Sequence, residues 1–140
     1  MLFRSLTPLG TAEFRREFTS PEPRFSTLAA VQGDRVVGFG CVAAFNSRGA
    51  YADTASIILY LRAGLTGRGV GTALCQELER RARQAGMHAL LASICAENEP
   101  SLKLFRKLGY REVGRFAEVG RKFGRWLDVV YVEKLLQPEG

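Results

Sequence analysis

A strand-to-helix junction crowded with glycine is the feature that most restricts the fold of this 140-residue chain. Residues 53–61 are rich in β-branched and aromatic side chains, which is typical of a strand. Over residues 69–85, apolar residues recur four apart while Glu77, Glu79 and several arginines occupy the other faces. This spacing predicts an amphipathic helix that ends at Gly86. A strand that leads directly into such a helix favours an α/β fold.

The remaining elements complete a mixed central sheet with helices on its faces. Residues 89–95 form a nearly unbroken apolar run, which predicts a central strand buried on both faces. Residues 28–31 and 36–39 flank Gly33-Asp34, a pair suited to a two-residue hairpin turn. The other predicted elements are a short helix over 10–18, a second helix over 101–108 closed by Gly109, and strands over 110–119 and 126–135 joined by the basic segment 120–125.

Length and composition exclude several classes of protein. A chain of this size is typical of one domain, so residues 1–140 are expected to form a single unit. The longest apolar run, Ile57–Leu61, is far shorter than the ~20 residues that cross a membrane. Three cysteines, an odd number, stand in apolar surroundings, which favours the reducing cytoplasm. The net charge of +6 attracts anions of any kind and does not by itself choose among them.

The glycine-rich junction has a chemical consequence as well as a structural one. Glycines at positions 67, 69 and 71 let the backbone approach a ligand closely, and the helix that follows offers free N–H groups to phosphate. Glycine-rich turns also occur for packing reasons, so both interpretations remain open at this point. The junction is not a Walker loop, because no Lys-Ser/Thr pair follows, and the dinucleotide-binding spacing is absent.

Three segments together resemble the Gcn5-related N-acetyltransferase (GNAT) superfamily. They are Gly67-Arg68-Gly69-Val70-Gly71, Asn98-Glu99-Pro100-Ser101 and Phe105-Arg106-Lys107-Leu108-Gly109-Tyr110. The run Arg121-Lys122-Phe123-Gly124-Arg125-Trp126-Leu127-Asp128 is similar to the phosphinothricin and methionine sulfoximine acetyltransferases, which acetylate the amino group of small amino-acid-like molecules. The resemblance implies the GNAT fold and acetyl-CoA as acetyl donor, with no metal.

The resemblance also implies a cofactor site. The end of the preceding strand is expected to splay from its neighbour and pair with the pantetheine arm, while backbone amides of the glycine loop hold the pyrophosphate. Asn98 and Ser101 match polar contacts of the family, and Lys107 or Arg106 is expected to reach the outer phosphates. The residues assigned to acetyl-CoA are Leu59, Tyr60, Leu61, Thr66, Gly67, Arg68, Gly69, Val70, Gly71, Thr72, Asn98, Ser101 and Lys107.

The catalytic positions depart from the family pattern. Ser56 stands where the family usually has a glutamate, and a hydroxyl is too weak a base to deprotonate an ammonium group, so at best it orients a water. Phe105 replaces the tyrosine or histidine that protonates the departing thiolate, and is interpreted as a core residue. His88, the sole histidine, is expected on the surface, away from the cofactor. Glu97 and Glu118 are further carboxylates that the spacing does not select.

The acceptor side is assigned to Tyr51, Lys122, Phe123 and Trp126, each of which has core or dimer-interface packing as an alternative role. Compared with relatives, the N-terminus is expected to be shortened by a strand and a helix that form part of the acceptor site. The shortening would leave the acceptor site more open. A second subunit can close such a site, so a homodimer is expected.

Three functions compete. The first is an acetyl-CoA-dependent N-acetyltransferase that transfers the acetyl group to the primary amine of a small, amino-acid-like molecule by direct attack. The second is a GNAT-like protein that binds acetyl-CoA with degenerate catalytic residues and little turnover. The third, a nucleic-acid-binding module, ranks last because the arginines are scattered and form no basic stripe with interleaved aromatics. A small-molecule partner is therefore expected, without nucleic acid or membrane.

Overall fold

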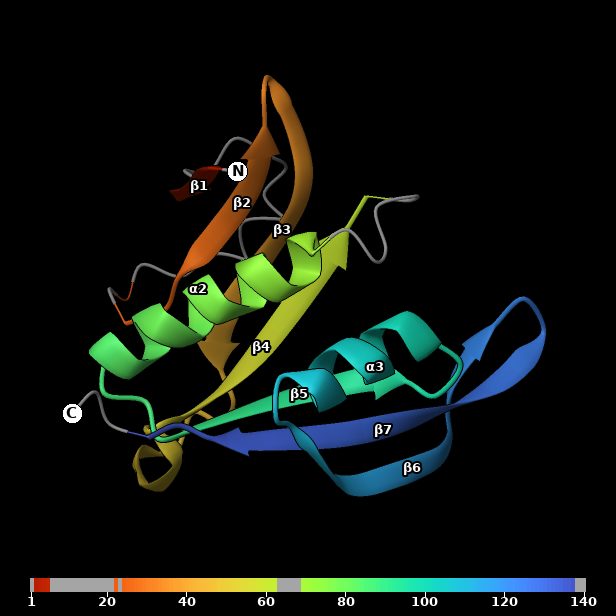
Figure 1. The fold of residues 1–140 in the computed structure, drawn as a ribbon. Coiled ribbons are helices and arrows are strands. Elements are labelled where there is room, and N and C mark those ends of the chain that lie inside the picture. The colour runs from red at the N-terminus through yellow and green to blue at the C-terminus, as the bar shows by residue number, and fades with distance from the viewer. Residues whose placement is uncertain (1, 6–21, 23, 63–68, 138–140) are drawn as a thin grey trace.

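A twisted seven-stranded sheet carries two helices in the structure, a computed structural model that describes residues 2–5, 22, 24–62 and 69–137 (Figure 1). The strand order is β1-β2-β3-β4-β5-β7-β6. The β4–β5 pair is parallel and the other pairs are antiparallel. The elements are β1 (Leu2–Ser5), β2 (Thr27–Gln32), β3 (Arg35–Ala44), the 3₁₀ turn η1 (Gly49–Tyr51), β4 (Thr54–Leu61), α2 (Val70–Gln84), β5 (Ala89–Cys95), α3 (Glu99–Lys107), β6 (Arg111–Lys122) and β7 (Arg125–Leu135).

The central elements confirm the sequence prediction. Helix α2 starts after Gly69, whose φ of +79° is in the left-handed region that glycine tolerates best, and stops before Gly86, with φ of +84°. Strand β5 has the predicted bounds. Helix α3 starts two residues earlier than predicted, because the Asn98 side chain accepts a hydrogen bond from the Ser101 backbone N–H (3.2 Å) and caps the helix there.

The two ends of the sheet differ from the prediction. Strand β1, which pairs with β2, corrects the expectation that the N-terminus lacks a strand; its four residues show no apolar alternation that would predict it. The predicted basic connection over 120–125 is wrong as well. Strand pairing continues to Lys122 and Arg125, so the turn is Phe123-Gly124, with φ values of 53° and 73°. The predicted helix over 10–18 lies outside the described residues.

Both helices cover the same face of the sheet (Figure 1). Leu74 and Leu78 of α2 and Phe105 of α3 belong to one apolar core with Leu90 and Ile94 of β5. The prediction that β5 is buried on both faces is wrong beyond Ala89, because Leu91 and Cys95 on the second face are half-buried and Ser93 is exposed. Within the described residues, no helix is both long and apolar enough to cross a membrane.

Candidate active site

Strands β4 and β5 diverge along most of their length. Their parallel pairing covers only three pairs, from Thr54 with Ala89 to Ser56 with Leu91. Beyond this point β4 continues to Leu61 and β5 to Cys95, with no further pairing between these described residues. The facing backbone edges of two diverging strands can accept an extended ligand as an additional strand. The splay implied by the family resemblance is therefore present.

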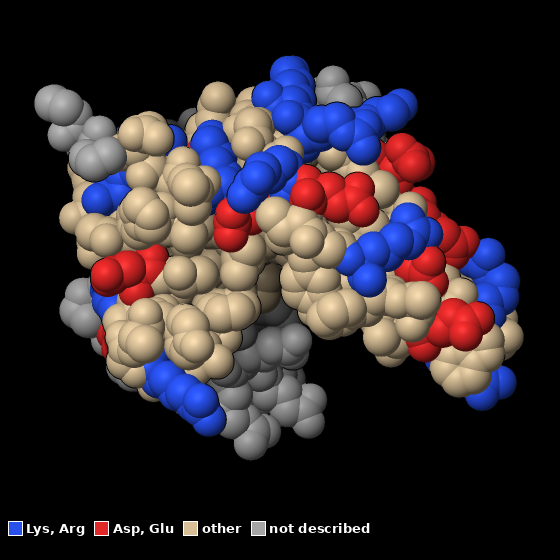
Figure 2. All heavy atoms as spheres, turned by 90° about the horizontal axis from the view of Figure 1, so that it is seen from below, with Lys and Arg blue, Asp and Glu red and all other residues tan. Residues whose placement is uncertain are grey.

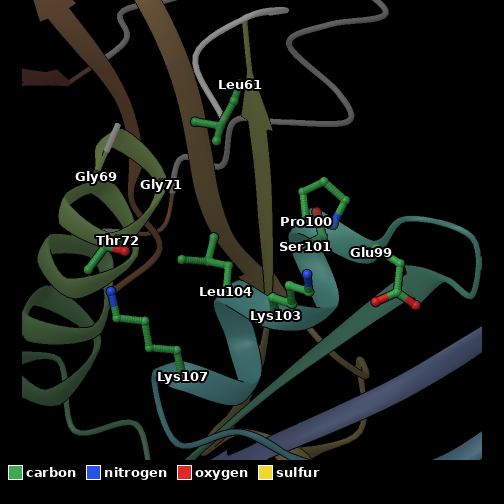
Figure 3. Close-up of a pocket in the computed structure, with 10 residues that line it drawn as sticks. All are labelled: Leu61, Gly69, Gly71, Thr72, Glu99, Pro100, Ser101, Lys103, Leu104 and Lys107. Atoms are coloured by element: carbon green, nitrogen blue, oxygen red, sulfur yellow. The ribbon is translucent and has the colours of Figure 1, made fainter. Parts of the chain in front are cut away.

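A cavity of about 450 Å³ lies between the start of α2 and the whole length of α3, close to the end of β4 (Figure 3). Its wall combines one strand residue, the first turn of one helix and one face of the other. The lining residues are Leu61, Gly69, Gly71, Thr72, Glu99, Pro100, Ser101, Lys103, Leu104 and Lys107. Six of them, namely Leu61, Gly69, Gly71, Thr72, Ser101 and Lys107, are residues that the sequence assigned to acetyl-CoA.

The cavity wall has the electrostatic character of a polyphosphate site. Gly69, the N-cap residue of α2, makes no side-chain cap and the first turn has no acidic residue, so neither neutralises the positive end of the helix dipole at the cavity wall. Lys103 and Lys107 add two cations from α3, and Lys107 extends toward Thr72 of α2 in Figure 3. In the same view the Glu99 carboxylate lies on the opposite side of the cavity from Lys107.

Gly71 of α2, Leu61 of β4 and Leu104 of α3 meet in this wall. A Cβ on Gly71 would lie 2.9 Å from Leu104 Cδ2 and 3.1 Å from Leu61 Cδ1, so the absence of a side chain at Gly71 leaves room for the ends of these two leucines. Glu99, Pro100, Lys103 and Leu104 were not predicted as site residues. Together with Lys107 they recur at helical spacing on one face of α3, and this spacing is the sequence signal that could have identified them.

Several residues assigned to acetyl-CoA occupy other positions. Val70 is buried in the core, and Leu59 packs against it. Tyr60 lies on the other face of β4, stacked on Phe39 with ring centroids 4.9 Å apart. Asn98 caps α3 and does not line the cavity. The remaining three, Thr66, Gly67 and Arg68, lie outside the described residues.

Ser56 occupies the point where β4 and β5 separate. It forms the last pair of the ladder, with Leu91, and its side chain points to the face opposite the buried Ala55 and Ile57. It is half-buried there. The cavity, which includes Leu61, therefore lies on the core-facing side of β4, and Ser56 points to the opposite side.

The other candidate acids and bases lie elsewhere. His88 is exposed at the start of β5, as expected, and Phe105 is a core residue in edge-to-face contact with Tyr110 (4.9 Å between ring centroids). Glu97 pairs with Arg125 across 2.8 Å. Glu118 has a positive φ of 55° at an irregularity of β6.

The residues assigned to the acceptor are not brought together. Tyr51 lies before the start of β4, at the other end of that strand from Leu61, and eight strand residues span roughly 26 Å at ~3.3 Å each. Lys122, Phe123 and Trp126 lie at the tip of the β6–β7 hairpin, where Phe123 is 87% exposed. The Lys122 ammonium lies 5.3 Å from the Phe123 ring centroid. These residues form an exposed aromatic and basic surface within a single chain.

Asp128 of the same sequence run has a structural role in the hairpin. Its carboxylate accepts hydrogen bonds from the Glu118 backbone N–H (2.9 Å) and from the Arg115 guanidinium (2.7 and 2.9 Å). These bonds, the backbone N–H first, hold the pKa of Asp128 below its usual range. Asp128 of β7 therefore stabilises the part of β6 around Glu118, where the strand pairing is irregular.

Comparison with known proteins agrees with this arrangement. Residues 3–110 match the model of the Acetyltransferase (GNAT) family. The chain is 31% identical over 131 residues to a phosphinothricin N-acetyltransferase of Streptomyces coelicolor, covering 90% of this chain and 77% of the relative. It is 33% identical over 111 residues to an L-methionine sulfoximine/L-methionine sulfone acetyltransferase of Pseudomonas paraeruginosa, covering 79% of this chain but only 64% of the relative.

A solved structure gives the same result. The crystal structure of a GNAT superfamily phosphinothricin acetyltransferase from Sinorhizobium meliloti in complex with acetyl-CoA superposes with a TM-score of 0.76 at 31% identity. The match covers 80% of this chain and 61% of that one. On the family match, the curated relatives and this shared fold, the chain belongs to the GNAT family of N-acetyltransferases.

Proposed function

We propose that this protein transfers an acetyl group from acetyl-CoA to the primary amine of a small, amino-acid-like molecule. The observation that carries the proposal is the position of the cavity. It lies between the uncapped start of α2 and two lysines of α3, beside Leu61 at the end of β4, and among the described residues β4 has no pairing with β5 beyond Ser56. The start of α2, which can bind phosphate, thus lies next to the free edge of β4, which can bind an extended chain. Coenzyme A has a pyrophosphate part and a pantetheine arm that require these two features side by side. The relatives named for phosphinothricin and methionine sulfoximine support the acceptor class.

The residues fit acetyl-CoA in two regions. Gly69, Gly71 and Thr72 offer the first backbone N–H groups of α2 to the pyrophosphate, with Lys103 and Lys107 beside them. The free edge of β4 up to Leu61 offers backbone groups to the pantetheine arm. Thr66, Gly67 and Arg68 are part of the same proposed loop. Bound acetyl-CoA supplies an activated thioester carbonyl.

The proposed reaction is a direct attack in a ternary complex. The neutral amine nitrogen forms a bond to the thioester carbonyl carbon, and the carbon–sulfur bond breaks to release the CoA thiolate. The proton lost by the amine passes to solvent, through a water that Ser56 orients, since the Ser56 hydroxyl is too weak a base to hold it. Phe105 is buried and cannot donate a proton, so the thiolate leaves without a side-chain acid.

Release of free CoA thiol tests this function directly. We expect acetyl-CoA to release thiol when methionine sulfoximine or phosphinothricin is supplied, and to release little with polyamines or peptide N-termini. Acetyl-CoA without an amine is the control. Binding of acetyl-CoA without thiol release for any amine of the panel would contradict the proposal and favour the degenerate alternative, which the relatives do not support.

The nucleic-acid alternative also lacks support from the surface. On the face drawn in Figure 2, acidic side chains lie between the basic ones over the right-hand lobe, so the basic groups there form no continuous stripe. A stripe of one sign is the usual footprint of nucleic-acid binding. The +6 charge is better explained by a substrate with several phosphates.

A homodimer in the cytoplasm completes the proposal. The β6–β7 hairpin exposes Phe116, Val119, Phe123 and Trp126, each more than half exposed, and a second copy would cover this apolar surface. The substrate residues Lys122, Phe123 and Trp126 would then serve a site shared by two chains. Light scattering is expected to give twice the mass of the chain, and Phe123→Glu is expected to give the monomer. If light scattering gives the mass of a single chain for the wild-type protein, the proposed dimer is contradicted.

A further inference from the structure

A buried carboxylate on α2 has no part in the proposed chemistry. Glu79 was predicted on a polar face of this helix, but its side chain is only 2% exposed and is the one fully buried charged group among the described residues. A buried charge is costly unless it is paired and hydrogen-bonded. The hydrogen-bond and ion-pair partners of Glu79 therefore indicate its structural role.

Both carboxylate oxygens of Glu79 have partners. Oε2 accepts from the Lys134 ammonium of β7 at 2.7 Å, with the Arg83 guanidinium at 3.6 Å. Oε1 accepts from the Cys75 thiol at 3.4 Å. Burial, and then the Glu79 charge, raise the pKa of Cys75 well above its usual range, so it stays a thiol and donates. Cys75 belongs to the apolar core, as expected, and its thiol also bonds to Glu79 there.

Lys134 connects this cluster to the second helix. Its Nζ also donates to the backbone carbonyl of Leu108 at 2.7 Å, and Leu108 is the C-cap residue of α3. The lysine stem passes under Gly109, where a Cβ would lie 3.7 Å from Lys134 Cε. The ammonium lies 5.6 Å from the centroid of the Tyr110 ring. One ammonium group thus bonds to a side chain of α2 and to the end of α3.

Two of the attachments between the helices that enclose the cavity bear on its width, and these bonds form the second. The first is the contact of Gly71 with Leu104, inside the cavity wall. The second joins Glu79, two turns further along α2, to the residue that follows Lys107. Helix α3 has nine residues and is roughly 14 Å long, so it moves as one short rod. A shift at its C-terminal end displaces Lys107 directly. The same shift rotates the helix around its contact at Leu104 and so displaces Ser101.

We propose that the Glu79–Lys134 pair and the Leu108 carbonyl position α3 against α2 and thereby set the width of the acetyl-CoA cavity. Neither side chain lines the cavity, so both are positioning residues. The inference rests on the proposed function for the identity of the ligand. It predicts that loss of the pair weakens acetyl-CoA binding while the rate of the bound complex changes little.

The test replaces the pair by apolar residues, Glu79→Leu with Lys134→Met. Replacing both partners of a buried ion pair by apolar groups of similar size often leaves stability unchanged, whereas removing one partner does not. We expect the double variant to fold and to bind acetyl-CoA about tenfold more weakly by calorimetry, because Lys103 and Lys107 would shift relative to the phosphates; this loss corresponds to about 1.4 kcal/mol of binding free energy. We expect kcat at saturating acetyl-CoA to change less than threefold. Lys134→Arg, which keeps the cation, should bind more tightly than the double variant.

Glu77→Gln is the matched control on the same helix. The Glu77 carboxylate bonds to Arg80 and Arg81, and these guanidinium groups, Arg80 first, lower its pKa to about 2, so it is charged under assay conditions. Its loss removes from α2 the same acidic charge as the Glu79 half of the pair, without touching α3, and we expect unchanged affinity.

Two failures are distinguishable. If the wild-type chain binds acetyl-CoA tightly and the double variant binds it equally tightly, the positioning role alone is overturned. Absence of binding by the wild-type chain would overturn the proposed function and the positioning role with it. If the apolar pair does not fold, Glu79→Gln with Lys134→Gln, which keeps hydrogen-bonding groups of shorter reach, is titrated in its place with the same outcomes.

Discussion

Gly69→Glu is expected to abolish measurable acetyl-CoA binding, with a loss of at least a hundredfold in affinity. Gly69 is the N-cap residue of α2 and lines the cavity. A Cβ at this position meets nothing within 4 Å, so the new side chain has room and its effect comes from its charge. At 4 Å and an effective dielectric constant near 20, two like charges repel by about 4 kcal/mol. A pyrophosphate at the start of α2 therefore cannot tolerate the carboxylate.

The matched control is Gly69→Gln, which has the same shape and the same backbone strain. A non-glycine residue at the φ of +79° costs about 1–2 kcal/mol in stability, and both variants bear this cost. The glutamate also interacts favourably with the helix dipole, so thermal melts should show it no less stable than the glutamine. Calorimetry should show only a few-fold loss for Gly69→Gln. Equal losses in both variants would mean that shape, not charge, is responsible, and unchanged affinity in both would refute the site.

The fold was predictable wherever neighbouring residues along the chain determine it. The spacing of Val70, Leu74 and Leu78 predicts α2, because one face of this helix is buried against the sheet. Strand β6 was misjudged at its end because it is exposed over almost its whole length and shows no apolar alternation. Strand β1 consists of four residues and depends on pairing with β2, a contact distant in the sequence.

The site was predictable on the α2 wall and only in part, at Ser101 and Lys107, on the α3 wall. The start of α2 could be assigned from the glycines and from the family resemblance. The α3 wall depends on how closely two helices pack, and that distance follows from Gly71 against Leu104 and from Lys134 beyond them. The burial of Glu79 was hidden for the same reason, because its partner lies 55 residues further along the chain. Helical periodicity shows which face a residue takes but not which distant side chain meets it.

Because a serine stands at position 56, where the family resemblance implies a general base, Ser56 is the position with the largest expected gain. Ser56→Glu is expected to raise kcat/KM with an amino-acid-like amine by tenfold or more, since a positioned general base commonly contributes 10²–10⁴-fold. Ser56 lies at the last β4–β5 pair, on the face opposite the buried Ala55, and is only half-buried. A longer side chain can thus extend from the splay without entering the core.

The pH dependence identifies the cause of such a gain. A glutamate that accepts the proton of the amine must be ionised, so the gain should disappear as the pH falls through the pKa of the new carboxyl. Ser56→Gln provides the same bulk without a base and should show no gain. Acetyl-CoA affinity should stay unchanged in both variants, because Ser56 lies on the other face of β4 from the cavity. Equal rates for the glutamate and glutamine variants at every pH would show that proton removal does not limit turnover, and that water alone serves this enzyme as the base.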